Sequence, residues 1–382
     1  QDSLNRKVKE NVTTINKYGN QILELNKQIQ RIEAAGIEHA NDLRDTRNQI
    51  LDELGKLCKM NYSEDYYGNI TVQIEGTDFV KGGMCYEIGL QTDATTGFYT
   101  PFWPQNAEYT VMADGTRSYD ITHAKVFDLD QTVSSTMDTD IGGLKAILLA
   151  RGDHRANYSD IEKDYDGISQ SIIMNMQAEF DQLIHNVATK INEVLANASD
   201  AERGYLCDKD GSPIQLFKKV TSDGWTKQTD AVGNTTWKYM EEDYDNTDTM
   251  YTLGNLKINN NLLQEPSMLG FKLADGKADY DTAEALKSAF TEEAYHLNPN
   301  VQKKTTFVDY YSDLVSQVAN SGSVFRSIYE NQEATVEATF SAREQVIGVS
   351  SDEELSNMIK FQNAYNAASR YINVISEMLE HV

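Results

Sequence analysis

The stretch LNRKVKENVTTINKYGNQILELNKQIQRI, residues 4–32, determines the architecture of this 382-residue chain. Its hydrophobic positions recur every seven residues in two interleaved series, so that the gaps alternate between three and four residues. This spacing places both series along one side of an α-helix, as in a coiled coil. The first series is Val8, Ile15, Ile22 and Ile29, and the second is Leu4, Asn11, Tyr18, Leu25 and Ile32. We therefore predict a long helix that buries this seam.

A second helix is predicted shortly after the first. The seam stops at Gly36, and glycine commonly ends helices because it adopts left-handed backbone angles without strain. Asn41 or Asp42 is placed to cap the start of the next helix. Its hydrophobic positions again recur every seven residues, with one more between them: Leu43, Ile50, Leu57 and Leu54. Residues 1–59 are thus predicted to form a helical hairpin that belongs to a rod.

The middle of the chain differs from its ends. Residues 60–145 alternate β-branched and polar side chains between glycine-rich turns, most clearly at 69–75, which predicts a β-rich inserted domain. Residues 146–199 return to hydrophobic spacings of three and four and are predicted to be helical and to pack on the rod. Residues 200–303 carry short aromatic segments and Asp-Gly turns, which predict a second mixed, β-rich region with a short helix near 282–290.

Residues 304–382 return to heptad spacing and are predicted to be the C-terminal helices of the rod and a polymerisation region. The first seam is Val308, Tyr311, Val315, Val318, Gly322, Phe325 and Tyr329. The last helix carries a cleaner seam: Met358, Phe361, Tyr365, Ala368, Ile372, Ile375, Leu379 and Val382. The predicted fold class is α+β, in which long paired N- and C-terminal helices form a bundle or rod and β-rich domains are inserted between them.

The composition argues against two classes of partner. The mean hydropathy is −0.54, and the chain lacks a run of ~18 uncharged hydrophobic residues, so no membrane insertion is expected. The net charge of −25 and the pI of about 4.6 disfavour nucleic acid, because phosphate binding needs clustered Lys and Arg. Most of the negative charge falls in 60–145 and 200–303, whereas 1–59 is close to neutral.

The residues also predict no catalytic, cofactor or metal site. Cys58, Cys85 and Cys207 are too few and too far apart for a disulfide framework, and they are interpreted as small hydrophobic residues. The six histidines are isolated in the sequence, and no glycine-rich nucleotide loop is present. The run Asp-Lys-Asp-Gly at 208–211 fits a β-turn better than a calcium loop, which needs glycine at its sixth position. A further acidic cluster is interpreted as a solvated loop: Asp128, Asp130, Asp138 and Asp140.

Two interpretations of the heptad seams remain open. A seam can be the inside of an ordinary helical bundle, which we expect for 1–59 and 304–345. It can also pack against a neighbouring subunit. For 358–382 this second interpretation competes with burial in the same chain, because this predicted helix is the last one in the sequence. Burial of its hydrophobic side chains, at ~25 cal/mol per Å², provides the driving force. The eight seam residues of the last helix are therefore the predicted subunit interface.

Two groups of residues resemble a known family. Near the N-terminus they are the run 41–47, NDLRDTR, preceded by Val12, Ile15, Asn16, Ile22, Leu25, Asn26, Gln28 and Ile29. Near the C-terminus the run 348–355, GVSSDEEL, leads into the run 359–367, IKFQNAYNA. Together they resemble the flagellar hook-associated protein 1 (FlgK) family. Hook and rod proteins share a similar C-terminal ending, so the N-terminal hairpin is what favours this family among flagellar axial proteins.

The resemblance implies a non-enzymatic structural protein of the bacterial flagellum. Such a protein is exported through the flagellar secretion channel and lies outside the cell, at the junction between hook and filament. The implied partners are the hook protein, the second hook–filament junction protein and further copies of the chain in a ring, with an export chaperone at the C-terminal helix. The family's N-terminal segment has no counterpart here, which implies a fragment. The alternatives are another axial protein (the second junction protein or a flagellin) and, less favoured, an axial protein with an enzymatic insertion.

Overall fold

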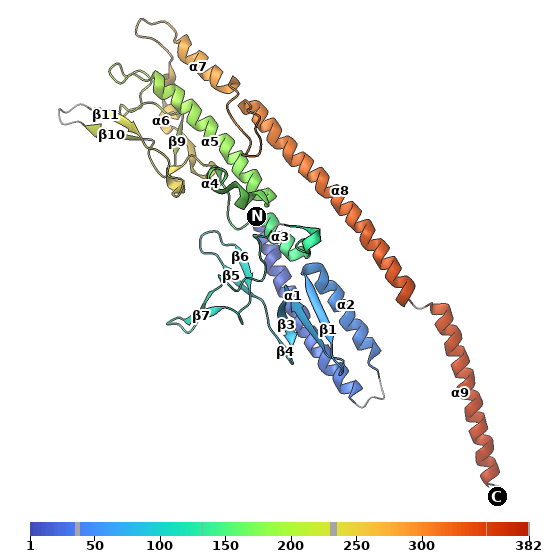
Figure 1. Ribbon diagram of the computed structural model, residues 1–382. Helices are drawn as coiled ribbons and strands as arrows, with labels where there is room; N and C mark the ends of the chain where they lie inside the picture. The colour runs from blue at the N-terminus through green and yellow to red at the C-terminus, as the bar shows by residue number, and fades with distance from the viewer. Residues whose placement is uncertain (35–38, 132, 230–234, 349, 381–382) are drawn as a thin grey trace. The chain divides into compact units, whose positions relative to one another are not determined.

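The structure is a computed structural model that describes residues 1–34, 39–131, 133–229, 235–348 and 350–380 (Figure 1). The chain divides into two compact units: a first unit, Gln1–Leu314, and a second unit from Val315 onward. Long helices occupy both ends of the sequence, and small antiparallel sheets lie between them, which confirms the predicted α+β class. The finer boundaries at 59, 145, 199 and 303 stay predictions.

The first unit begins with the predicted pair of helices, and a four-stranded antiparallel sheet and two β-hairpins follow (Figure 1). Gly36, the predicted helix end, lies outside the described residues. The helices are α1 (Asp2–Glu33) and α2 (Asn41–Leu57). The sheet runs in the order β1 (Met60–Glu64), β2 (Ile70–Ile74), β3 (Thr77–Lys81) and β4 (Met84–Cys85). The hairpins pair β5 (Gly89–Thr92) with β6 (Tyr99–Phe102) and β7 (Glu108–Val111) with β8 (Arg117–Asp120).

The rest of the first unit is organised around a long helix. The helices of this part are α3 (Gly143–Arg151), α4 (Tyr158–Ser169), α5 (Ile172–Ala198), α6 (Asn260–Gln264) and α7 (Tyr280–Thr291). Two small antiparallel ribbons accompany them: β9 (Phe217–Lys219) with β12 (Leu256–Ile258), and β10 (Trp225–Thr229) with β11 (Thr235–Tyr239). Four short 3₁₀ turns complete the described elements: Ser135–Met137, Thr247–Thr249, Leu253–Asn255 and Pro266–Leu269.

Helix α1 buries one of the two predicted series and replaces the other. The first series is buried as predicted: Val8, Ile15, Ile22 and Ile29. No member of the second series, from Leu4 to Ile32, is buried, and its place is taken by Val12, Gly19 and Asn26. The physical reason is that α1 packs on strands β3–β6 as well as on α2 and α3, so the buried face is turned toward the sheet. The predicted helix is therefore confirmed, but the prediction that it buries the second series was wrong.

Gly19 allows the sheet to approach α1 closely. A Cβ atom at this position would lie 2.6 Å from the Sγ atom of Cys85 and 2.7 Å from the Cε1 atom of Phe79, and closer still to the Cζ atom of the same ring. Carbon atoms in contact are normally about 3.5–4.0 Å apart. A glycine is thus required here by packing, although glycine weakens a helix.

Three asparagines of α1 attach the β-rich region to the helix. The side-chain amide of Asn16 donates to the carbonyl of Ile88 at 2.9 Å, and its oxygen accepts from the N–H of the same residue at 2.9 Å. Asn26 makes the same pair of bonds with Ile70, at 2.8 Å and 3.1 Å. Asn5 bonds in the same way to backbone groups at the end of the β5–β6 connection. Each amide therefore substitutes for a neighbouring strand, which satisfies one backbone donor and one acceptor.

The start and the buried face of α2 also differ from the prediction. The helix begins at Asn41, but the N-cap is Ala40, and neither Asn41 nor Asp42 caps it. Glu33, at the end of α1, instead accepts from the backbone N–H of Ala40 at 3.0 Å and bonds to Arg44 at 2.6 Å. The bond from Arg44 lowers the pKa of Glu33 to about 2. The buried side chains are Arg47, Leu51 and Leu54, whereas Leu43, Ile50 and Leu57 are half-buried.

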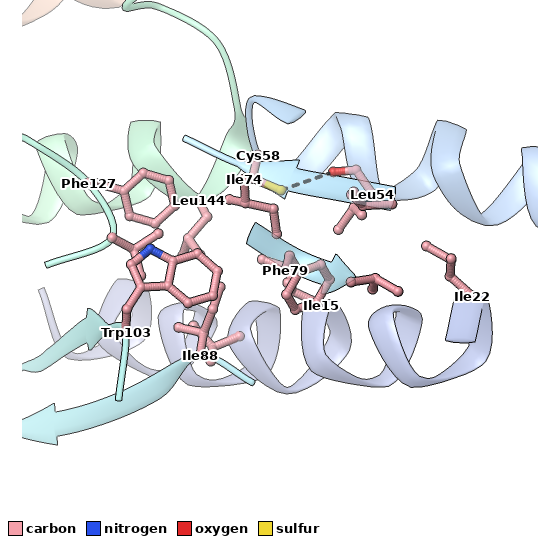
Figure 2. Close-up of a cluster of buried hydrophobic side chains, with 14 of the residues drawn as sticks. Ile15, Ile22, Leu54, Cys58, Ile74, Phe79, Ile88, Trp103, Phe127 and Leu144 are labelled. Atoms are coloured by element: carbon pink, nitrogen blue, oxygen red, sulfur yellow. Dashed lines mark hydrogen bonds between the residues drawn. The ribbon is translucent and has the colours of Figure 1, made fainter. Parts of the chain in front are cut away.

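One hydrophobic core joins α1, α2, α3 and the first sheet (Figure 2). Ile15 of α1 and Leu54 of α2 are completely buried, together with Ile74 of β2 and Phe79 of β3. Trp103 closes the core, with its ring centroid 6.3 Å from that of Phe79. This core fixes the helical hairpin to the β-rich region, so the two form one structural unit.

A second set of cores surrounds α5. One core joins Leu183 of α5 to Leu297 and to the first two turns of α8 (Phe307–Ile347), which contribute Phe307, Tyr310 and Leu314. These residues have the predicted spacing of three and four but lie one position before the predicted seam. The predicted residues Val308, Tyr311 and Val315 are 68%, 53% and 48% exposed. The start of α8 is therefore buried within the first unit through the neighbouring face of the helix. Direct pairing of the C-terminal helices with α1 and α2 stays a prediction.

Candidate subunit interface

The second unit consists of the remainder of α8 and of α9 (Ser351–Glu380). Both helices form readily, because the last proline of the sequence is Pro299 and α9 contains no glycine. Among the side chains that the structure describes between 315 and 380, none is buried. These two helices carry many hydrophobic residues, but their described residues form no buried core. Their hydrophobic side chains are therefore exposed to solvent.

The predicted interface residues lie on α9 and are exposed. The exposed fractions of Met358, Phe361, Tyr365, Ile372 and Ile375 range from 40% to 75%, and Ala368 is also exposed. The backbone of Leu379 is helical, its side chain is not among those described, and Val382 lies outside the described residues. The predicted seam therefore exists as a continuous, uncovered surface over Met358–Ile375. Its role as a subunit contact stays a prediction.

A second row of hydrophobic residues on α9 was missed by the heptad template. Tyr371, Val374 and Met378 are 68%, 51% and 66% exposed. At about 100° per residue they lie roughly 100° around the helix from the predicted seam. The hydrophobic surface of the C-terminal half of α9 thus covers about half of the circumference. One heptad seam serves one partner helix, and a surface of this width fits two neighbours.

The second part of α8 is exposed in the same way. Phe325 and Tyr329, which belong to the predicted seam, are 52% and 65% exposed. Beyond 314 the described residues of this seam are exposed, and its burial within the same chain stays a prediction. The additional exposed hydrophobic residues of α8 are Val324, Ile328, Val336, Phe340 and Val346. The candidate interface thus extends over both helices of the second unit.

Cys58 and Asp208, two further positions considered in the sequence, make contacts within the fold. Cys58 is buried, donates to the carbonyl of Leu54 at 3.5 Å (Figure 2), and burial raises the pKa of its thiol to about 12. Asp208 accepts from the N–H of Gly211 through its carbonyl at 2.9 Å, which confirms the predicted turn. Its carboxylate pairs with Lys218 at 2.6 Å. Within the described residues no group of three or more His, Cys, Asp or Glu side chains is arranged to hold a metal ion.

The architecture defines the class of this protein: an α+β protein in which terminal helices carry β-rich insertions and a long helix exposes its hydrophobic surface. The helices of the described residues include none long and hydrophobic enough to cross a membrane. Residues 1–207 match the family described as flagellar hook-associated protein FlgK helical domain. Residues 346–382 match the family described as flagellar basal body rod FlgEFG protein C-terminal. The chain belongs to the FlgK family.

Individual relatives agree with this family. The chain is 24% identical over 391 residues to flagellar hook-associated protein 1 of Bacillus subtilis, a match that covers 100% of the chain and 66% of that relative. It is 23% identical over 389 residues to flagellar hook-associated protein 1 of Escherichia coli, covering 97% of the chain and 69% of that relative. The chain thus spans about two thirds of the length of these curated relatives.

A solved structure is also similar to part of the chain. It is the flagellar hook junction protein FlgK from Burkholderia pseudomallei, at 20% identity and a TM-score of 0.38. The match covers 58% of this chain and 32% of that one.

Proposed function

We propose that this chain is a structural, non-enzymatic subunit of the junction between the flagellar hook and filament, in the extracellular part of the flagellum. Membership of the FlgK family supports this proposal, because the names of the relatives place them with the hook. The observation that carries it is the uncovered hydrophobic surface of α9. An exposed surface of this extent marks a site of protein contact.

In this proposal copies of the chain assemble as a ring, and the second unit provides the contacts. The seam from Met358 to Ile375 packs against one neighbouring helix, and the row of Tyr371, Val374 and Met378 packs against another. The proposed neighbours are other copies, the hook protein and the second hook–filament junction protein. An export chaperone covers the same surface before secretion, because a chain with such a surface needs protection from aggregation.

A charge placed on the seam tests the proposal. Phe361→Glu and Ile372→Glu each introduce a carboxylate into the proposed contact, and Asn366→Glu introduces one on the opposite side of the same helix. In a strain that lacks its own hook-associated protein 1, the gene that encodes this protein is expected to restore motility and to stop filament protein from leaking into the medium. We expect the Phe361 and Ile372 variants to fail and the Asn366 variant to succeed. Because the proposed chaperone covers the same surface, the secreted amount of each variant is measured alongside, and only the failure of a secreted variant supports the subunit interface.

Full motility of both seam variants contradicts the proposed interface. Failure of the unaltered gene favours another flagellar axial protein, the alternative supported by the match of 346–382 to rod proteins. An axial protein with an enzymatic insertion is the least supported candidate, because no nucleophile, metal or nucleotide motif accompanies the β-rich regions.

A further inference from the structure

A cavity of about 570 Å³ lies in the first unit, between α5 and the β10–β11 hairpin. One wall is the face of α5 that carries His185, Thr189 and Glu193. The opposite wall includes Trp225 and Tyr239 of the hairpin. A volume of roughly 300–1,000 Å³ with aromatic walls and a few polar groups is typical of small-molecule sites. None of the lining residues belongs to α8 or α9, so a ligand site here is independent of the proposed function.

The charged side chains that line this cavity are carboxylates. They are Glu193 on α5 and Glu241 and Glu242 in the segment that follows β11. Among the described lining residues there is no lysine or arginine. Burial lowers the pKa of His185, which also lines the cavity, so its imidazole is neutral near pH 7. The lining therefore repels anions.

Two of the three carboxylates already have partners within the protein. Glu193 pairs with Lys190 of the same helix at 3.3 Å. Glu242 accepts a hydrogen bond from the hydroxyl of Tyr158. Glu241 is exposed and has no ion pair or hydrogen bond with the part of the chain that the structure describes. One negative charge at the cavity is thus left uncompensated.

The hairpin presents three aromatic rings on one face, and two of them already contact a lysine. Trp225 pairs with Tyr239 across the ribbon, and Trp237 lies two residues before Tyr239, on the same face. The ammonium of Lys227 lies 5.9 Å from the centroid of the Trp237 ring. The ammonium of Lys219 lies 5.9 Å from the centroid of the Tyr239 ring. Trp225 has no such cation among the described residues, although indole is the ring that attracts cations best.

The uncompensated carboxylate lies at the Trp225 end of the hairpin. The N–H of Met240 donates to the carbonyl of Gly224 at 3.0 Å, which continues the pairing of the two chains beyond Tyr239. Side chains two residues apart share a face of a strand, so Glu241 follows Tyr239 on the face that carries the rings. Glu241 and Trp225 therefore line the same cavity from neighbouring chains.

These features select an organic cation. The described residues hold no group of three or more side chains arranged for a metal ion, and a neutral ligand leaves the charge of Glu241 uncompensated. A guanidinium group has a flat face that stacks on an aromatic ring and N–H donors that match a carboxylate. We propose that the cavity binds a guanidinium group, stacked on Trp225 and paired with Glu241. Its source is either an arginine side chain of another protein or a small guanidinium compound.

The first experiment tests the ligand class with the full chain. Nα-acetyl-arginine methylamide and its neutral isostere, Nα-acetyl-citrulline methylamide, are titrated at millimolar concentrations and followed by saturation-transfer NMR and calorimetry. We expect the arginine compound to bind at least about five-fold more tightly than the citrulline compound, and added salt to weaken it. Absence of binding by the arginine compound, or equal binding by the two compounds, overturns the proposal.

A third compound distinguishes the two sources. Methylguanidine carries the charged group without the peptide backbone. Tighter binding of the capped arginine assigns the site to an arginine side chain of another protein, and tighter binding of methylguanidine assigns it to a small guanidinium compound. Either order supports the proposed ligand class. Choline, a cation without N–H donors, overturns the pairing with Glu241 if it binds more tightly than both.

The second experiment tests the two proposed contacts with matched substitutions. Glu241→Gln removes the charge and should weaken the arginine compound about five-fold. Glu202→Gln removes an exposed carboxylate that does not line the cavity and should leave binding unchanged. Trp225→Phe keeps a ring that attracts cations less and should weaken binding about two- to three-fold, whereas Trp237→Phe, outside the lining, should not. Equal effects within either pair overturn the assigned contact.

Discussion

At the scale of single residues, buried polar side chains connect the parts of the first unit. The side-chain amides of Asn16 and Asn26 each bond to both the N–H and the carbonyl of one residue of the β-rich region, as a neighbouring strand would. Asn26 also accepts from the buried guanidinium of Arg47 at 2.9 Å, so one amide joins α1, α2 and β2. Asn192 on α5 repeats the device, donating to the carbonyl of Phe217 at 2.8 Å. Such groups stabilise only while every partner is present.

The substitution Asn26→Leu tests this dependence. It leaves the N–H and the carbonyl of Ile70 buried without partners and removes one acceptor from Arg47. We expect a loss of about 3 kcal/mol in the free energy of unfolding, measured by urea titration with circular dichroism. Asn20→Leu makes the same change at an exposed position of α1 and should cost less than about 0.5 kcal/mol. Equal effects of the two substitutions would show that the buried amide contributes little.

Asp208 gives a pH-dependent contribution to stability. Burial alone would raise the pKa of this carboxyl, but bonds from Lys218, Asn261 and Asn259 hold it at about 2, against 3.8 in the unfolded chain. The stabilisation is therefore complete above about pH 4 and is lost as the pH falls toward 2. We expect Asp208→Asn to be less stable than the original protein at pH 6, and this difference to shrink in acid unfolding series between about pH 4 and pH 2. A difference that stays constant with pH would contradict the assignment.

At the scale of elements, the sequence predicts helices better than it predicts which side they bury. The seven-residue period identifies α1 because Val8, Ile15, Ile22 and Ile29 are all hydrophobic. It misses Gly19 and Asn26, because a glycine and an amide count as poor core residues until a sheet packs against them. At the start of α8 the same spacing occurs on two adjacent faces, and only the tertiary contacts with α5 select Phe307, Tyr310 and Leu314.

The candidate interface shows a similar limit. The exposed seam on α9 follows from hydrophobic periodicity alone, and the structure finds these positions uncovered where their side chains are described. The second row, Tyr371, Val374 and Met378, was missed because a heptad template assumes one partner per helix. The cavity beside α5 could not be predicted, because its walls come from segments that are about 40 residues apart and meet only in the folded chain.

Gly19 in α1 and Gly55 in α2 provide a matched pair of substitutions. In an open helix, alanine is favoured over glycine by about 1 kcal/mol. At Gly55 the nearest atom to a new Cβ is 4.0 Å away, so Gly55→Ala should stabilise the protein by up to about 1 kcal/mol. At Gly19 the new Cβ meets Phe79 and Cys85, so Gly19→Ala should destabilise it by about 1–3 kcal/mol. Thermal unfolding of both variants measures the sign, and a stabilising Gly19→Ala would refute the close approach of β3 and β4.

At the scale of the whole molecule, the buried cores and the proposed assembly surface lie in different parts of the chain. Every buried hydrophobic cluster of the described residues lies within Gln1–Leu314. The second unit instead carries exposed hydrophobic helices. If the second unit is the contact surface, as proposed, substitutions there should change assembly without loss of folding.

Deletion of 350–382 tests this division. Because no described side chain in this segment is buried, we expect the thermal midpoint of the remaining chain to change by less than about 2 °C. In the complementation strain, the same deletion should abolish assembly at the junction. A filament that forms normally would show that the last helix is dispensable, and a large drop in the thermal midpoint would show that α9 supports the fold.

The three asparagines of α1 also restrict how this protein can diverge. Asn5, Asn16 and Asn26 hold successive parts of the β-rich region at fixed intervals along the helix, about 16 Å apart at 1.5 Å per residue. One inserted residue between them would move every later anchor by about 100° around the helix. The loops of the β-rich region can therefore vary in length. The number of residues in α1 between the three asparagines cannot, although other side chains of the helix can be replaced. The number of residues between these asparagines therefore fixes the positions, along and around α1, at which the β-rich region is held.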